Sequence, residues 1–172
     1  MSSEYPDEKK CLEILRMAGC DEEIIAHCIC VKEMALKIAR RCRVPVNLKL
    51  VTAGALLHDI GRSVTHGVAH GVKGSEIARK MGLSEDVVRI IERHVGGGID
   101  AAEAAVIGLP ARDFMPETVE EKIVCLADKL IANNRVAGIE AEVRKLKEKG
   151  LHVAAERVLQ LYREIVALCG EI

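Results

Sequence analysis

Aromatic residues are scarce in this chain of 172 residues, which has two tyrosines, one phenylalanine and no tryptophan. Proteins that bind nucleic-acid polymers use aromatic platforms on which bases stack, or a basic stripe along the phosphates. Here 25 Lys and Arg stand against 26 Asp and Glu, for a formal net charge of −1. We therefore expect no nucleic-acid polymer as a partner, whereas a small anionic ligand needs only a few local cations.

Long apolar runs and targeting signals are also missing. No apolar stretch reaches the roughly 18 residues that a transmembrane helix needs. The first residues, 1–6, lack the basic-then-apolar pattern of an export signal. The sequence therefore predicts no membrane partner and a cytoplasmic location.

The cysteines form no CxxC pair, and their number is odd. A zinc ribbon requires such pairs, and a disulfide framework is typical of small secreted domains. We interpret these residues as small side chains that fill the core, without disulfides. They stand at positions 11, 20, 28, 30, 42, 125 and 169.

What the sequence does contain is apolar residues at helical spacing, with no segment alternating like a half-buried strand. With 49% apolar residues, the chain can bury one sizeable core. We expect an all-α fold of about seven to nine helices in a single domain over residues 1–172. The expected helices are 7–18, 22–43, 48–59, 75–81, 84–95, 101–107 and 119–132, and two charged amphipathic helices within 138–172.

The last segment, 138–172, has an apolar stripe that can pack on the rest of the domain or on a second copy of the chain, so a homodimer is possible.

The most informative motif lies earlier, at His58-Asp59-Ile60-Gly61-Arg62. An adjacent His and Asp offer a divalent metal ion a neutral imidazole and a hard carboxylate, and a short carboxylate can bridge two ions. Taken alone, the pair is more typical of a polar helix end.

Other histidines and one aspartate change this interpretation. They lie on the apolar faces of separate expected helices, or in the glycine-rich segment 62–74, which we expect to be a loop. Burying imidazoles and carboxylates is costly unless they are paired. A shared metal ion explains several such groups in one helical bundle more simply than separate hydrogen bonds do. These residues are His27, His70, His94 and Asp128.

The order of these residues resembles the HD superfamily of metal-dependent phosphohydrolases, in the subset with an HDIG motif, over roughly residues 20–137. The resemblance implies an HD-type helical bundle with a metal site in its core. It is strongest to bacterial enzymes that split diadenosine tetraphosphate symmetrically and to uncharacterised archaeal-type HDIG proteins. One metal ion would be held by His27, His58, Asp59 and Asp128, and a second by His70 and His94, with Asp59 bridging.

The resemblance also implies roles for other residues and a cofactor. One or two divalent ions, iron, manganese or another first-row metal, would activate water for attack on phosphorus. Arg62 stands where several relatives have lysine, and His66 lacks a counterpart, so we interpret His66 as a polar loop residue. The implied catalytic residues are Asp59, Arg62 and His70, and the implied substrate contacts are Arg62, Lys73, Lys129 and Arg135.

The expected function is therefore hydrolysis of a phosphoester or phosphoanhydride in a nucleotide or a dinucleoside polyphosphate. Two alternatives remain open. One is a phosphodiesterase or nucleotidase that acts on another small phosphoester. The other is a non-catalytic, metal-containing module that senses nucleotides. The metal hypothesis makes one geometric prediction: the donor atoms of His27, His58, Asp59 and Asp128 converge on one point.

Overall fold

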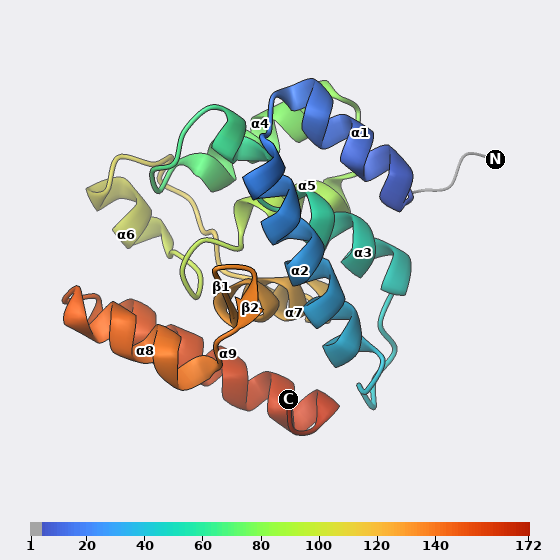
Figure 1. Cartoon of the computed structure of the whole chain (residues 1–172). Helices are drawn as coiled ribbons and strands as arrows, with labels where there is room; N and C mark the ends of the chain where they lie inside the picture. The colour runs from blue at the N-terminus through green and yellow to red at the C-terminus, as the bar shows by residue number, and fades with distance from the viewer. Residues whose placement is uncertain (1–4) are drawn as a thin grey trace.

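The computed structural model describes residues 5–172, which fold into α-helices α1 to α9, a short 3-10 helix η1 and a small hairpin (Figure 1). The predicted all-α class is confirmed. No helix in this described part is long and apolar enough to cross a membrane. The elements are α1 (Glu8–Ala18), α2 (Glu22–Ala39), α3 (Leu48–Leu57), η1 (Ile60–Ser63), α4 (His70–Lys80), α5 (Glu85–Glu92), α6 (Ala101–Val106), α7 (Val119–Lys129), β1 (Ile131–Ala132), β2 (Arg135–Val136), α8 (Ile139–Glu148) and α9 (His152–Cys169).

Side chains at the helix starts explain where these elements begin. At five of them, an oxygen of the preceding residue accepts the backbone N–H of the third helical residue. Such caps satisfy donors that the first helical turn leaves unpaired. The capping residues are Asp7, Asp21, Asn47, Asp100 and Thr118.

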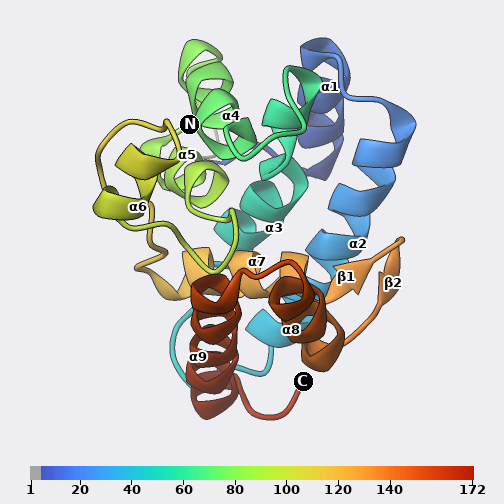
Figure 2. The same cartoon turned by 90° about the vertical axis from the view of Figure 1, so that its left-hand side faces the viewer.

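Helix α3 lies at the centre of the fold, in contact with α1, α2, α5 and α7 (Figure 2). Seven of its ten residues are buried, as expected for a helix that is apolar nearly all round. Ile90 of α5 packs so closely that a Cβ on Gly54 would lie 2.5 Å from its Cδ1. This central position carries His58 and Asp59, which follow α3, into the middle of the molecule.

The C-terminal stripe packs on the chain itself. Figure 1 shows α8 and α9 side by side along one edge of the molecule, where α9 contacts α7. The buried residues of α9 belong to the main hydrophobic cluster. The sequence left open whether this stripe packs on the rest of the domain or on a second copy of the chain. Within this chain, it packs on the domain's own core. The residues are Ala155, Val158, Leu161, Ile165 and Cys169.

Several helix limits differ from the expected ones. Helix α2 ends at Ala39 rather than Arg43, and α4 begins at His70, inside the segment expected to be a loop. Its glycines serve close packing instead: a Cβ on Gly74 would lie 2.7 Å from Ile91 of α5. A Cβ on Gly61, in η1, would likewise overlap the backbone of His70. Packing between helices outweighs the local preference of glycine for loops.

A hairpin and a disulfide were not predicted. β1 and β2 pair antiparallel, with Ile131 opposite Val136, around a turn at Asn133 and Asn134. The interpretation of all cysteines as unpaired core residues is wrong for Cys42 and Cys169, which form a disulfide across 127 residues of sequence. Packing of α9 brings these distant residues together. The free cysteines Cys11, Cys20, Cys28 and Cys125 are buried, and Cys30 is half-buried.

Candidate metal centre

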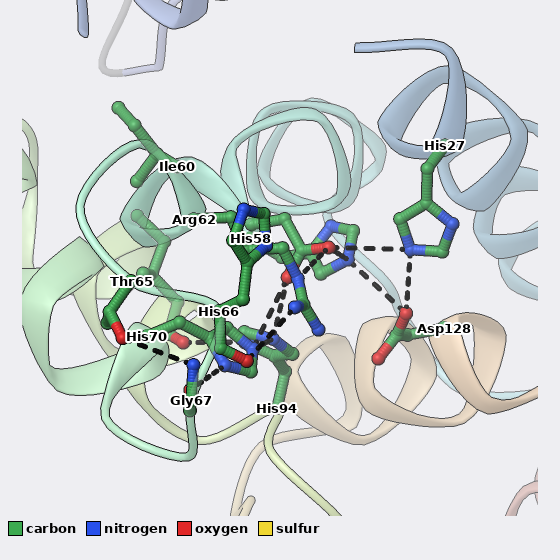
Figure 3. Close-up of polar contacts among 12 residues, drawn as sticks. His27, His58, Ile60, Arg62, Thr65, His66, Gly67, His70, His94 and Asp128 are labelled. Atoms are coloured by element: carbon green, nitrogen blue, oxygen red, sulfur yellow. Dashed lines mark hydrogen bonds and ion pairs between the residues drawn. The ribbon is translucent and has the colours of Figure 1, made fainter. Parts of the chain in front are cut away.

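All six predicted metal ligands meet in one place, although they come from five helices or their ends (Figure 3). His27 lies on α2 and Asp128 on α7, while His58 and Asp59 follow α3 directly. His70 begins α4, and His94 lies just beyond α5. The helical periodicity that placed these residues on apolar faces thus predicts their convergence.

The first cluster joins His27, His58, Asp59 and Asp128. Asp128 Oδ1 lies 2.9 Å from His27 Nε2 and 3.4 Å from His58 Nε2. Asp59 Oδ2 lies 3.5 Å from each of the same two nitrogens. Donors bound to one ion at about 2.0–2.2 Å are separated from each other by about 3.0–3.5 Å, so these spacings suit a single ion. The predicted convergence of these four side chains is therefore present.

The second cluster contains Asp59, His70 and His94. Asp59 Oδ1 lies 3.4 Å from His70 Nε2 and 3.2 Å from His94 Nε2, and the two nitrogens are 3.0 Å apart. All three side chains are buried. Because Oδ2 faces the first cluster and Oδ1 faces the second, the Asp59 carboxylate lies between the two.

Backbone contacts fix which nitrogen of each buried histidine points inward. Nδ1 of His58 donates to Ala55 O at 2.6 Å, and Nδ1 of His94 donates to Ile91 O at 2.7 Å. Nδ1 of His70 donates to Gly67 O at 2.8 Å. A neutral imidazole carries one N–H, so in its neutral form each ring presents the Nε2 lone pair to the centre. Nδ1–H bonded to a carbonyl is the usual arrangement of a metal-binding histidine.

Two lone pairs consequently face each other at 3.0 Å, on His70 and His94. Burial and the neighbouring His94 lower the pKa of His70 to about 3, and burial also lowers the pKa of His94. Both rings are therefore neutral at pH 7, and neither donates a proton to the other. A cation between them would relieve this contact.

The first cluster has a different charge balance. Burial acts to lower the pKa of His58, but the carboxylate of Asp59 and other neighbours raise it above the ordinary value. Burial acts to raise the pKa of Asp59, yet His58 and His94 hold it well below its usual range. Asp128 also has a lowered pKa, because Lys129 outweighs the effect of burial. This half of the centre is therefore built from charged groups.

Unpaired atoms support the same conclusion. His58 Nε2 and Asp59 Oδ1 are buried and make no hydrogen bond within the described part of the chain. Such atoms normally cost about 1–3 kcal/mol each unless a partner is supplied. Imidazole and carboxylate donors of this kind are the ligands that first-row divalent metals prefer. The residues present thus fit one or two such ions.

Two of the four predicted substrate contacts touch the metal-ligand set. Arg62 Nε lies 3.0 Å from Asp59 Oδ2, and the side chain remains about one-third exposed. Lys129 Nζ lies 2.6 Å from Asp128 Oδ2 and donates to His94 O at 3.1 Å. The Asp128 carboxylate raises the pKa of Lys129 against the effect of its burial. Lys129 therefore holds Asp128 in place, whereas Arg62 has donors left for a ligand.

The other two predicted contacts lie elsewhere. Lys73 is exposed and pairs with Glu76 at 3.4 Å. Arg135 is exposed on β2. Neither lines the cavity at the metal centre, so the structure brings Arg62 and Lys129 to the site and leaves Lys73 and Arg135 outside it.

A cavity of about 320 Å³ opens onto the first cluster. His66, interpreted from the sequence as a bystander, is part of its wall, and so is the hairpin turn, for which the sequence analysis had no role. The Asn-Asn pair was the available signal, because asparagine tolerates the left-handed conformation of a two-residue hairpin turn. The lining residues are Asp21, Glu23, Ile24, His27, Asp59, Arg62, His66, Asn133 and Asn134.

The family assignment follows from a comparison with family models. A model described as "HD domain" matches residues 24–133. All six predicted metal ligands, from His27 to Asp128, lie within this match. The chain belongs to the HD domain family. The expected HD superfamily of metal-dependent phosphohydrolases is thereby confirmed.

Two relatives match nearly the whole length of this HD protein. It is 44% identical over 165 residues to a protein of Picrophilus torridus named tRNA (cytidine(56)-2'-O)-methyltransferase, covering 96% of this chain and 48% of the relative. The chain thus spans about half the length of that relative. It is 43% identical over 163 residues to an uncharacterized protein of Methanocaldococcus jannaschii, covering 91% of this chain and 95% of the relative.

A solved structure shares the HD fold. The crystal structure of the HD domain of the L. monocytogenes phosphodiesterase PgpH, in complex with cyclic-di-AMP, matches with a TM-score of 0.56 and 14% sequence identity. The match covers 92% of this chain and 94% of the other. At this identity the likeness concerns the fold alone.

Proposed function

We propose that this HD protein is a metal-dependent phosphohydrolase that cleaves a phosphoester of a nucleotide. The observation that supports this most is Asp59, whose two oxygens face two separate groups of imidazole nitrogens beside an open cavity. A carboxylate shared in this way is typical of centres with two metal ions. The proposed metal ligands are His27, His58, Asp59, His70, His94 and Asp128.

Divalent ions at such a centre supply a water of lowered pKa and stabilise negative charge on phosphoryl oxygens. The chain's own residues do the positioning. Arg62 stands at the cavity wall with Nε on Asp59 and is the proposed phosphate contact, since guanidinium suits phosphate oxygens. Asp59 orients Arg62 and faces both histidine groups. His70, proposed from the resemblance as catalytic, is buried behind Asp59 and acts as a ligand rather than as a proton donor.

The test is hydrolysis by purified protein loaded anaerobically with iron or manganese. We expect release of phosphate or nucleotide from some member of a panel of nucleoside phosphates, cyclic nucleotides and p-nitrophenyl esters. Asp59→Asn should lower that activity by about 10³-fold or more and reduce the bound metal. Glu33→Gln, an exposed charge change on α2 outside the cavity, is the matched control. A metal-loaded protein that hydrolyses no ester would contradict the proposal.

A second candidate substrate is suggested by the relatives. The name of the Picrophilus protein refers to tRNA, whereas the sequence of our chain predicted no nucleic-acid polymer. An RNA end, presented as a 2′,3′-cyclic phosphate or a terminal phosphate, would offer this site the same ester chemistry. Equal rates on a mononucleotide and on an oligoribonucleotide with the same terminus would favour the small substrate, while a large preference for the oligonucleotide would favour RNA.

The non-catalytic alternative was motivated by the apolar stripe of the C-terminal segment, which packs on α7 within this chain. A non-catalytic nucleotide-sensing module, a dinucleoside polyphosphate substrate and a homodimer remain predictions.

A further inference from the structure

The cavity at the metal centre has an outer half that the proposed hydrolysis does not use. Its inner wall carries His27, Asp59 and Arg62. Its outer wall is formed by the start of α2, the loop before α4 and the turn between β1 and β2. The residues there are Asp21, Glu23, Ile24, His66, Asn133 and Asn134.

The hairpin turn lies against α2. Cys30, one turn after His27 on α2, donates its thiol to Asn134 O at 3.6 Å. Asn133 and Asn134 have φ angles of 51° and 59°, as a two-residue hairpin turn requires. Within residues 5–172, neither side-chain amide hydrogen-bonds another protein group, and both are exposed. The turn therefore places two exposed amides on the cavity wall.

The start of α2 gives the outer half a negative charge. Asp21 Oδ1 accepts the backbone N–H of Ile24 at 2.9 Å, which leaves its other oxygen available. In the described part of the chain neither Asp21 nor Glu23 has an ion-pair partner. Two carboxylates repel a second phosphate group placed near them but accept hydrogen bonds from hydroxyl groups. Ile24, which follows Glu23, is half-buried and adds an apolar surface.

The size of the cavity also favours a small ligand. Its volume of about 320 Å³ is at the lower end of the range of about 300–1,000 Å³ for small-molecule sites. One nucleotide fits this space, whereas a dinucleoside polyphosphate has two nucleosides and several charges to accommodate.

We propose that the outer half of the cavity binds the uncharged nucleoside of a substrate that carries a single phosphate. This inference rests on the proposed function and specifies its substrate class. The amides of Asn133 and Asn134 each offer donors and an acceptor, which match the mixed pattern on the edge of a base. Asp21 and Glu23 select against a polyphosphate. Triphosphates and dinucleoside polyphosphates are therefore poorer substrates than monophosphates.

The first experiment separates base recognition from turn formation. Glycine adopts positive φ without cost, so Asn133→Gly and Asn134→Gly keep the turn and remove the amide. The measurement is kcat/KM of the metal-loaded protein for its fastest nucleoside monophosphate, divided by kcat/KM for p-nitrophenyl phosphate. We expect this ratio to fall about 3–10-fold for each variant, as for loss of a hydrogen bond. An unchanged ratio in both would overturn the base-reading role and leave the asparagines as turn formers.

The second experiment tests selection against polyphosphates. Asp21→Asn keeps a capping side chain, and Glu23→Gln keeps the length of the glutamate. In the double variant, the ratio of kcat/KM for the triphosphate to that for the monophosphate should rise about tenfold. Glu33→Gln, on the same helix but away from the cavity, should leave this ratio unchanged.

The two proposals fail in different ways. A protein that hydrolyses no phosphate ester contradicts the proposed function itself. A protein that hydrolyses p-nitrophenyl phosphate but prefers triphosphates to monophosphates, or whose preferences none of these variants alters, remains a phosphohydrolase and refutes the nucleoside subsite.

Discussion

The two ligand clusters share Asp59 but differ in what they face. The first, with His27, His58 and Asp128, opens to the cavity through His27 and Asp59. The second, with His70 and His94, is buried behind the shared carboxylate and does not line that cavity. A ligand in the cavity therefore meets the first cluster directly.

The clusters also differ in how well they tolerate the absence of a metal ion. The first contains two carboxylates, and its His58 has a raised pKa, so a proton can take up part of the charge. The second opposes two lone pairs, and both of its histidines have lowered pKa values. A proton thus substitutes for a metal ion in the first cluster better than in the second. From this difference we expect the clusters to respond differently to the same kind of mutation.

The largest effect is expected on activity. His58→Gln should remove the ion of the first cluster and lower kcat by about 10³-fold, because this cluster faces the cavity. His94→Gln should remove the other ion and lower kcat by about 10²-fold, since the ligands nearest the substrate remain. Metal analysis should show about one ion fewer in each variant. Equal losses of activity would mean that the clusters do not have distinct roles.

The next effect is on stability and involves Lys129. Lys129→Met removes the partner of Asp128 and should destabilise the metal-free protein by about 3 kcal/mol, as for other broken buried ion pairs. With metal bound, the ion supplies positive charge to Asp128, so the loss should be smaller. Urea unfolding of both forms measures the two values. A larger loss in the metal-bound form would contradict the role of Lys129 as the partner of Asp128 that a metal ion can replace.

A smaller effect, of opposite sign, is expected in the second cluster. In His70→Gln an amide N–H replaces one of the opposed lone pairs and can donate to His94 Nε2. The metal-free variant should therefore be more stable than the metal-free parent by about 1 kcal/mol. The same variant should bind less metal and gain less stability from it. If the metal-free variant is less stable, the lone pairs of His70 and His94 do not oppose each other.

The smallest effect is the pH dependence of the metal-free protein. The pKa of His70 is about 3 in the folded state and about 6.5 when unfolded, so below pH 6.5 the unfolded chain binds more protons. Stability should consequently fall as the pH drops from about 6.5 to 5.5, a range above most of the titration of the carboxylates. The slope of unfolding free energy against pH should be smaller in His70→Gln. Parallel slopes would show that His70 is protonated in the folded state.

The ligand set could be predicted because it depends on local patterns. His27 and Asp128 fall on apolar helix faces, and His58 and Asp59 end an apolar helix, so helical spacing alone points them inward. The capping residues likewise fixed where most helices begin.

The remainder depends on contacts between distant segments. The glycines around His70 were interpreted as loop residues, whereas Gly74 lies within α4 because only glycine fits against Ile91. Lys129 was predicted to bind phosphate, but its position beside Asp128 and His94 O arises from the packing of α7 against α5. His66 and the hairpin turn likewise line the cavity wall only because distant segments pack together.

The bond between Cys42 and Cys169 closes most of the domain into a covalent ring. Helices α3 to α9 lie within this ring, whereas α1 and α2, which carries His27, lie outside it. A loop of 127 residues loses chain entropy equivalent to about 5 kcal/mol in the unfolded state. The bond therefore raises resistance to heat while lying away from the site, whereas the helix that carries His27 is held by its packing on α3 and α7.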